Sequence, residues 1–191
     1  GGGASTVPGG QPGACLRYFA GGVGRIGTPG AAAWRATLGR FWSHEFAERI
    51  VVDPDEDHVW LLTREASFVE FSTLAGSSGV QPYTAVAPSD EYRTLFHDFS
   101  TGEWELVDLD GDRFFYDAQG RWYRSQDRNG NAWVGSYNVA GKLESVDFPD
   151  GQADEFTYDT SGRLRTIVRM GVGGSLTRTW TYEWAGVDLI R

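Results

Sequence analysis

The sequence predicts an all-β fold in which tandem β-hairpin repeats form an extended twisted sheet. From residue 41 onward, short runs rich in β-branched and aromatic residues alternate with Gly, Pro and Asp, and helical periodicity is almost absent. Aromatic residues make up 14% of the 191 residues, a composition that favours sheets. In the C-terminal half, a tyrosine and a following glycine recur every 21 residues, which indicates a repeated supersecondary unit.

Residues 1–33 are the first of three expected regions and are rich in Gly, Pro, Ala and Ser. We expect a loop, an arm or a disordered segment here, interrupted by the apolar group at 16–19. Residues 31–38 have the composition for one helical turn. The chain begins with three glycines and no Met, so we expect a fragment or a processed product.

The second region, residues 34–109, reads as a strand-rich segment that leads into the repeats. Its alternating runs predict strands at 49–52, 58–63, 67–71, 95–99 and 104–109. An acidic turn at 53–57 joins the first two of these strands as a hairpin. Residues 74–89 contain a Gly-Ser cluster and two prolines, and we expect a loop there.

The third region, residues 110–191, contains about four hairpin repeats. Three copies share Tyr, then Asp or Asn, two variable residues, Gly, a basic residue and an apolar residue: Tyr116–Trp122, Tyr137–Leu143 and Tyr158–Leu164. A fourth, degenerate copy around Tyr182 and Gly186 follows after 24 residues rather than 21.

Each position of the repeat has a physical role in a hairpin. The Asp or Asn side chain accepts backbone hydrogen bonds and opens a type I turn, and the glycine tolerates the positive φ that closes the turn with a bulge. The Tyr and the residue two positions before it share one face, as period-two packing requires. Between the repeats stand Asp110-Gly111, Asn129-Gly130 and Asp150-Gly151, dipeptides that favour primed turns.

Two apolar pairs in the outgoing strands do not fit a regular strand. Leu143 with Val146 and Leu164 with Ile167 are three positions apart, so a regular strand would place the members of each pair on opposite faces. Either a bulge brings each pair to one face, or both faces meet other elements. Because a short stack of hairpins also has two unpaired edges, we expect neighbouring repeats or a partner along at least one edge.

The repeat resembles the YD repeat of the Rhs family, which includes bacterial Rhs polymorphic toxins, wall-associated proteins, toxin-complex C components and animal teneurins. The family pattern Tyr-Asp-x-x-Gly-Arg-Leu is present at 158–164. Residues 127–131 resemble an Asp-Arg-x-Gly-Asn turn of early Rhs repeats, and residues 37–46 resemble the segment that introduces many Rhs cores. The resemblance covers about residues 34–191.

This resemblance implies a structural role. In the family, such repeats form a β-strip that spirals into a hollow shell, commonly around a variable C-terminal toxin domain. We therefore expect a non-catalytic, encapsulating segment of a secreted or cell-surface protein used in bacterial competition. Its expected partners are neighbouring YD repeats of the same or another chain, an encapsulated toxin domain, or a glycan. The residues expected to define the repeats structurally are Tyr116, Asp117, Gly120, Arg121, Tyr137, Asn138, Gly141, Leu143, Tyr158, Asp159, Gly162, Arg163, Leu164, Tyr182 and Gly186.

Composition argues against several other classes of function. Lys and Arg total 17 against 26 Asp and Glu, a net charge of −9, which disfavours nucleic acid as a partner. The single cysteine, Cys15, allows no intramolecular disulfide and no multi-cysteine metal site. No apolar run approaches the roughly 20 residues that a membrane-spanning helix needs.

No motif indicates catalysis, a metal ion or a cofactor, and we expect none. The acids of 53–57 and of 108–112 alternate as in a calcium loop, but the first set lacks the required Gly and Glu, and a hairpin turn explains the second. His44 follows Ser43, yet adjacent residues of a strand face opposite ways, so no nucleophile–base pair is expected.

Two alternatives stay open. In the first, a carbohydrate- or surface-binding β module, exposed aromatic rings stack on sugars beside polar side chains. The candidate glycan-stacking residues are Trp122, Trp133, Trp180 and Trp184, for which packing in the repeat core is the competing explanation. In the second, a hydrolase, two acids that no motif marks meet in a cleft.

Overall fold

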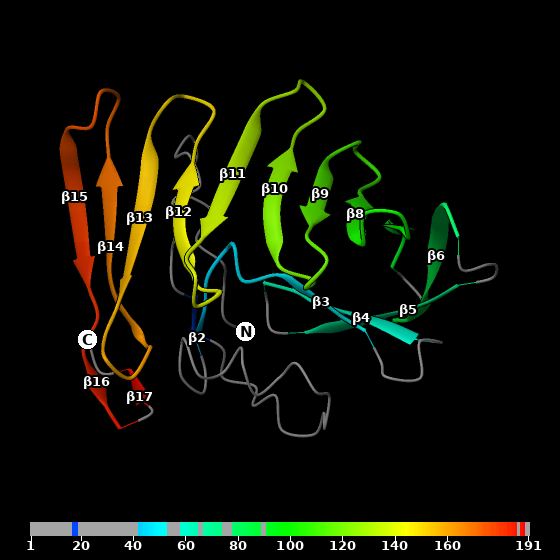
Figure 1. Cartoon of the computed structure of the whole chain (residues 1–191), viewed down its shortest axis with the longest axis horizontal. Coiled ribbons are helices and arrows are strands. Elements are labelled where there is room, and N and C mark those ends of the chain that lie inside the picture. Colours follow the sequence, from blue (N-terminus) through cyan, green and yellow to red (C-terminus); the bar gives the residue numbers. More distant parts are fainter. Residues whose placement is uncertain are drawn as a thin grey trace, which may run out of the picture.

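The computed structural model describes residues 17–18, 42–52, 58–64, 67–73, 78–88, 91–186 and 188–189 (Figure 1). The predicted all-β class is confirmed, because these residues form strands, turns and connecting loops and no helix. Thirteen strands make one antiparallel sheet in which every strand pairs with its neighbours in sequence. They are β3 (Arg49–Val52), β4 (His58–Leu62), β5 (Phe68–Thr73), β6 (Val80–Ala87), β7 (Thr94–Asp98), β8 (Glu103–Val107), β9 (Arg113–Tyr116), β10 (Trp122–Gln126), β11 (Ala132–Tyr137), β12 (Leu143–Asp147), β13 (Ala153–Tyr158), β14 (Leu164–Met170) and β15 (Leu176–Thr181).

Two short strand pairs lie outside this sheet. β1 (Arg17–Tyr18) pairs with β2 (Trp42–Ser43), and β16 (Trp184–Ala185) pairs with β17 (Asp188–Leu189). β1 falls within the apolar group that interrupts the Gly-rich arm. The rest of that arm lies outside the described residues, together with Cys15 and the helical turn predicted at its end.

The strands predicted in the segment before the repeats agree with β3, β4, β5, β7 and β8 to within two residues at each end. The loop predicted over 74–89 is wrong, because β6 occupies Val80–Ala87 within it. Pro82 is accommodated since β6 pairs with β5 only from Tyr83 onward, which leaves Pro82 with a strand on one side only. The acidic turn expected at 53–57 lies outside the described residues.

The hairpins turn in one common way. The N–H of Gly120 donates to the carbonyl of Asp117 at 2.7 Å, and Gly120 has a φ of 73°. The primed turns predicted between the repeats are wrong, because the N–H of Gly111 likewise donates to the carbonyl of Asp108 at 3.1 Å. The other two inter-repeat turns contain the same bond. Both kinds of turn are therefore four-residue turns with a bulge glycine at the fourth position.

A bulge in each repeat hairpin brings the apolar pairs to one face. The pairing of β11 with β12, and that of β13 with β14, shifts register beside the repeat tyrosine. Leu143 and Val146 are both buried as a result, and so are Leu164 and Ile167. Of the two explanations that the sequence left open, the bulge is the correct one.

The sheet curls until its first strand meets the repeats. The backbone N–H of Ile50 in β3 donates to the carbonyl of Gly120 at 2.8 Å, and Arg49 forms an isolated antiparallel bridge with Arg121. A β-carbon on Gly120 would lie 2.1 Å from the carbonyl oxygen of Ile50, so only glycine fits at this crossing. In Figure 1, β3 to β5 run across the direction of the upright repeat strands. One edge of the sheet therefore meets the same chain.

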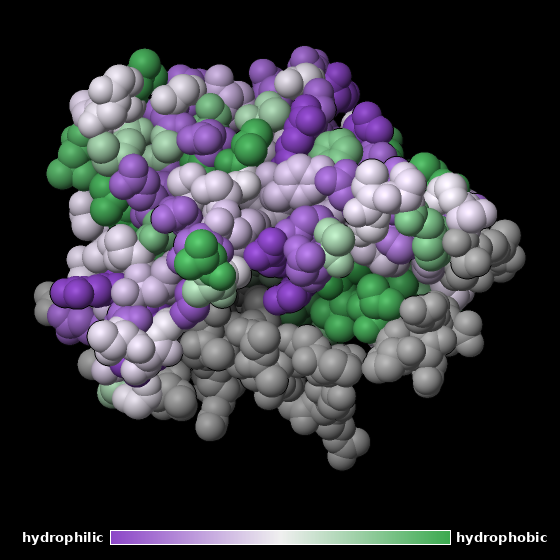
Figure 2. All heavy atoms as spheres, viewed as in Figure 1, coloured by the Kyte–Doolittle hydropathy of each residue, from purple (hydrophilic) through white to green (hydrophobic). Residues whose placement is uncertain are grey.

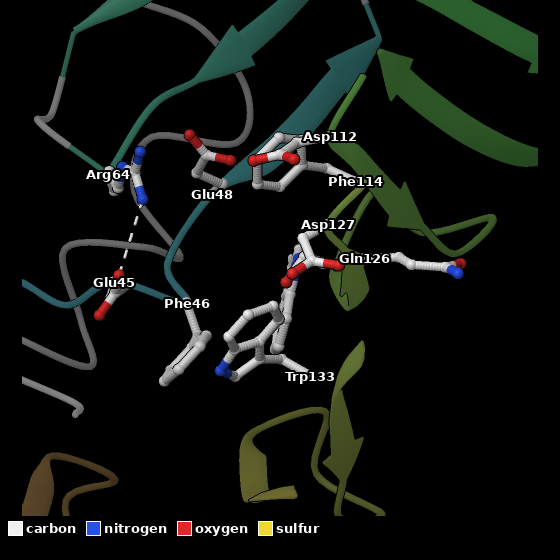
Figure 3. A pocket seen from close by; sticks show the side chains of 11 residues that line it. Glu45, Phe46, Glu48, Arg64, Asp112, Phe114, Gln126, Asp127 and Trp133 are labelled. Atoms are coloured by element: carbon white, nitrogen blue, oxygen red, sulfur yellow. Dashed lines mark ion pairs between the residues drawn. The ribbon is translucent and has the colours of Figure 1, made fainter. Parts of the chain in front are cut away.

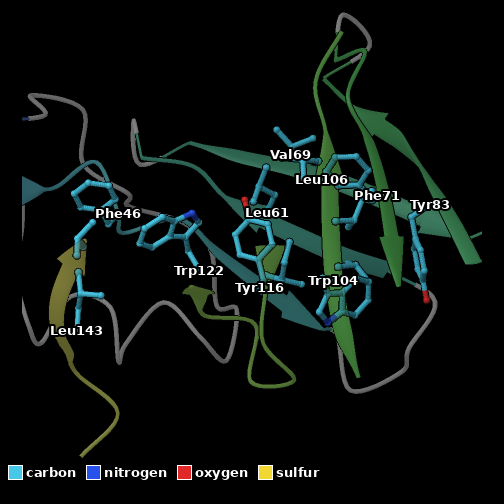
Figure 4. Close-up of a cluster of buried hydrophobic side chains, with 14 of the residues drawn as sticks. Phe46, Leu61, Val69, Phe71, Tyr83, Trp104, Leu106, Tyr116, Trp122 and Leu143 are labelled. Atoms are coloured by element: carbon cyan, nitrogen blue, oxygen red, sulfur yellow. The ribbon is translucent and has the colours of Figure 1, made fainter. Parts of the chain in front are cut away.

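One hydrophobic core joins the two halves of the sheet (Figure 4). Tyr116 is 0% exposed and lies opposite Trp104 in β8 and Trp122 in β10. Phe46, from the segment before β3, packs on Trp122 with ring centroids 4.8 Å apart and on Phe148 at 6.3 Å. The segment before β3 therefore covers the buried face of the repeats.

The surface seen in Figure 2 mixes hydrophilic and hydrophobic side chains over the upright strands. Exposed apolar residues such as Val139 and Val172 lie singly in turns. Scattered residues of this kind are normal on a protein surface and mark no site.

Candidate functional site

The repeat tyrosines link each hairpin to the one before it. The hydroxyl of Tyr137 donates to the carbonyl oxygen of Trp122 at 2.5 Å, and that of Tyr158 donates to the carbonyl of Leu143 at 2.7 Å. Each accepting residue lies beside the bulge of the preceding hairpin. Burial raises the pKa of both tyrosines, so the hydroxyls stay protonated at neutral pH. The tyrosines thus satisfy backbone groups in the repeat before their own.

A basic residue in each turn forms a second link. Arg121 pairs with Asp117 at 2.6 Å and its guanidinium lies 4.5 Å from the ring centroid of Tyr137 in the next hairpin. Lys142 lies 5.0 Å from the centroid of Tyr158, again one hairpin further on. A cation over an aromatic face is attractive, so successive hairpins are joined by both a hydrogen bond and a cation–π contact.

The fourth copy continues these links with other residues. Trp184 makes the side-chain hydrogen bond to the preceding hairpin, since its indole N–H donates to the carbonyl of Leu164 at 2.7 Å. Arg163 lies 5.7 Å from the centroid of the Trp184 ring. Gly186 has the expected positive φ, 61°, but it belongs to a tight turn between β16 and β17. The fourth copy therefore departs from the turn geometry of the other three.

The first repeat tyrosine, Tyr116, has a different acceptor. Its hydroxyl donates to a carboxylate oxygen of Glu48 at 3.1 Å, across 68 positions of sequence. Glu48 is 8% exposed, and its burial raises the pKa of the carboxyl against the opposing attraction of Arg64 and Arg93. Glu48 thus takes the place that a backbone carbonyl of the preceding repeat has in later copies.

A cavity of about 210 Å³ opens beside Glu48, where the segment before β3 meets the repeats (Figure 3). Glu45 and Glu48 line it from that segment, and Asp112 and Asp127 line it from the turns before β9 and β11. Arg64 also lines it and forms an ion pair with Glu45 at 3.7 Å. Carboxyl groups therefore outnumber basic groups in its wall.

Aromatic rings form much of the remaining wall. Phe46 and Trp133 lie on one side of the cavity in Figure 3, and Phe114 lies on the other. The indole N–H of Trp133 is buried and has no hydrogen-bond acceptor among the described residues. The cavity therefore combines an apolar wall with several carboxylate acceptors.

The structure separates the four tryptophans proposed to stack on glycans. Trp122 is 3% exposed and packs against Phe46 in the core, so little of its surface can meet a sugar, although it also lines the cavity. Trp133, Trp180 and Trp184 are half-buried. Of these three, Trp133 lines the cavity.

His44 packs in the core beside the repeats. Its Nδ1 accepts a hydrogen bond from the backbone N–H of Phe46 at 3.1 Å, and its ring centroid lies 5.8 Å from that of Phe156. Burial lowers the pKa of His44 to about 4, so the ring is neutral at neutral pH. The segment 108–112 forms a hairpin turn. Within the described part of the chain, no group of three or more His, Cys, Asp or Glu side chains is arranged to hold a metal ion.

Sequence reasoning missed the contribution of Glu45, Glu48 and Arg64 to this site. None of them belongs to a motif, and they come from a part of the chain far from the repeats they meet. The one available signal was the likeness of residues 37–46 to the introduction of an Rhs core. That segment includes Glu45 but not Glu48 or Arg64, and its likeness assigns no role to any side chain.

No family model matches this chain, and no curated protein matches it. Among the described residues there is no helix long and apolar enough to cross a membrane. The resemblance to the Rhs family therefore rests on the sequence motifs alone.

Proposed function

We propose that this chain is a non-catalytic structural segment of an Rhs/YD-repeat protein, part of a strip or shell that is secreted or held at the cell surface. The observation that carries the proposal is the unbroken series of side-chain links between hairpins. It runs through Tyr116, Tyr137, Tyr158 and Trp184. Each link ties one repeat to the element before it, as in other arrays whose stability depends on nearest neighbours.

Hydrogen bonds within each turn engage the aspartates that a catalytic role in the repeats would need. Asp117 accepts from the backbone N–H groups of Gln119 and Arg121 as well as from the Arg121 guanidinium. Asp159 makes the equivalent bonds in its own turn. Because these aspartates already accept several hydrogen bonds, we favour a stiff sheet that further hairpins can extend over a surface with reactive side chains.

The outer edge of β15 is the place where we propose that the sheet is extended. β15 pairs with β14 alone within the sheet, and its residues 176–179 are exposed. An unpaired edge presents N–H and C=O groups to another strand. A further hairpin of this or another chain is the proposed partner there, and an enclosed toxin domain is the proposed partner of the assembled shell.

The complete gene and its product provide the test. The open reading frame is expected to continue into further Tyr-Asp-x-x-Gly repeats and then into a domain without them. Electron microscopy of the full product is expected to show a hollow particle, and limited proteolysis is expected to leave the last domain intact. A product without further repeats, or one whose last domain is cleaved as fast as a free domain, would contradict the proposal.

A further inference from the structure

The turn between β10 and β11, residues 127–131, contains the only Asn-Gly sequence of the chain, Asn129-Gly130. Both residues are exposed. An asparagine followed by glycine can react with its own backbone, because glycine has no β-carbon to hinder the approach of its amide nitrogen to the preceding side chain. The side-chain links between repeats use neither residue. The structural role proposed above therefore does not involve this reactivity.

The side chain of Asn129 differs from those of the other two asparagines, all three of which the structure describes. Asn131 donates its side-chain amide to Asp127 at 2.7 Å. The side-chain oxygen of Asn138 accepts from the N–H groups of Ala140 and Lys142 at 3.0 and 3.1 Å. Asn129 has only its backbone N–H engaged, with the Asp127 carboxylate, among the described residues. Its carboxamide is thus the one that no contact holds in place.

The backbone of the same turn sets the pace of the reaction. The N–H of Gly130 donates to the carbonyl of Asp127 at 3.0 Å, so its nitrogen reaches the Asn129 side chain only when the turn opens. The bonds that hold the turn are local, since Asp127 accepts from the N–H groups of Asn129 and Asn131 as well. Exposed turns open at a lower free-energy cost than the sheet they join. We therefore expect the folded chain to react, but more slowly than the unfolded chain.

We propose that Asn129 deamidates spontaneously in the folded protein and becomes isoaspartate. The amide nitrogen of Gly130 attacks Cγ of Asn129 and loses its proton. The new C–N bond closes a five-membered succinimide, and the Cγ–Nδ2 bond breaks as ammonia leaves with that proton. Water then adds to one of the two imide carbonyls and opens the ring. Opening at one carbonyl gives aspartate, and opening at the other leads the backbone through the former side chain and gives isoaspartate.

Isoaspartate at this position lengthens the backbone of the turn by one carbon atom. The bond from Gly130 to Asp127 spans the altered residue, so it loses its geometry. This turn joins β10 to β11, next to the pair Gln126 and Ala132. At the other end of the two strands, the bond from Tyr137 to the Trp122 carbonyl stays in place. The modification therefore loosens one end of the junction between the first two repeat hairpins.

The test incubates the full chain at mildly alkaline pH, in buffer and in guanidinium chloride, and follows each asparagine by mass spectrometry of its peptides. In buffer, the Asn129 peptide is expected to gain the mass that replacement of NH₂ by OH brings, with isoaspartate as the main product. Asn131 and Asn138 are expected to stay unmodified. Hydrogen exchange at the Gly130 and Asn131 amides is expected to rise about fivefold in the isoaspartate form, as the loss of one hydrogen bond implies.

Asn129→Asp is the matched control, because it carries the charge of the product on an unaltered backbone. Its amide exchange should stay near that of the wild type. An Asn129 that is still intact in buffer after the unfolded chain has converted would overturn the proposal, since the folded turn would then block the attack. Equally fast conversion of Asn131 or Asn138 in buffer would overturn it too. Equal amide exchange in the isoaspartate form and in Asn129→Asp would overturn the loosening of the turn.

Discussion

The hydroxyl of Tyr116 donates to the buried carboxyl group of Glu48, in the place where the later repeat tyrosines reach a backbone carbonyl. This contact closes the first repeat against the segment before β3. A carboxyl group removed from water requires partners of this kind, because its desolvation is otherwise uncompensated. Burial raises the pKa of Glu48 even with Arg64 and Arg93 nearby, so desolvation outweighs the attraction of the two cations.

Glu48→Gln is expected to stabilise the fold at neutral pH. The amide keeps an acceptor for Tyr116 and removes a buried charge. Because the folded-state pKa of Glu48 is raised, the ionised form is the disfavoured one, and the advantage of Gln should shrink as the pH falls and Glu48 becomes protonated. Urea unfolding at several pH values measures this.

Glu48→Ala is the contrasting variant. It leaves the Tyr116 hydroxyl without its acceptor and is expected to cost on the order of 2–3 kcal/mol of unfolding free energy. If the Gln variant proves as destabilised as the Ala variant, the charge itself, through Arg64 and Arg93, holds the segment in place.

Removal of the hydroxyls from Tyr137 and Tyr158 tests the links between repeats. Each Tyr→Phe change keeps the ring beneath its cation and removes the hydrogen bond from the hydroxyl to a part-buried backbone carbonyl, so each is expected to cost about 1–2 kcal/mol. Tyr123→Phe is the control, since its hydroxyl makes a long, exposed contact of 3.4 Å with Glu103. That change should cost less than about 0.5 kcal/mol. Equal losses of unfolding free energy at all three positions, measured by chemical denaturation, would show that the hydrogen bonds between repeats stabilise the fold no more than an exposed contact does.

The fold class was predictable because its signals are local. Alternating runs and the 21-residue period depend on residues close in sequence. The turn type between repeats was misjudged because the Asp110-Gly111 dipeptide was read in isolation. Asp108 stands three positions before Gly111, in the same relation as Asp117 to Gly120, and that spacing predicts the four-residue turn that the structure contains.

The cavity was not predictable, because its residues come from two parts of the chain that only the curl brings together. Glu45 and Glu48 precede β3, whereas Asp112 and Trp133 belong to the repeats. No local period relates these positions. The strand β6 was missed for a different reason: Pro82 is a valid signal against a strand, but it fails where one side of the strand is unpaired.

Gly120→Ala tests the contact that closes the curl. A β-carbon there would lie 2.1 Å from the carbonyl oxygen of Ile50, and the residue has a φ of 73°. Gly79→Ala is the matched control, with a φ of 68° and open space around the added carbon. We expect a loss of about 1–2 kcal/mol for the control, from backbone strain alone, and a larger loss at Gly120. Hydrogen exchange at the Ile50 amide should accelerate in the Gly120 variant only. Similar losses and unchanged exchange in both variants would show that β3 does not depend on this crossing.

The buried ring of His44 predicts a stability that depends on pH. The pKa of His44 is about 4 in the folded chain against 6.5 for an exposed histidine, so the unfolded state binds a proton more readily over this interval. The stability that the neutral, buried His44 ring contributes is fully present above pH 6.5. It is lost as the pH falls toward 4, by an amount on the order of 3 kcal/mol. His44→Asn keeps an acceptor for the Phe46 N–H but does not titrate, so the variant should lose less stability than the wild type over that interval. His97 remains in both proteins, and its own lowered pKa cancels from the comparison. Parallel curves of unfolding free energy against pH for the two proteins would show that His44 is already accessible to protons in the folded state.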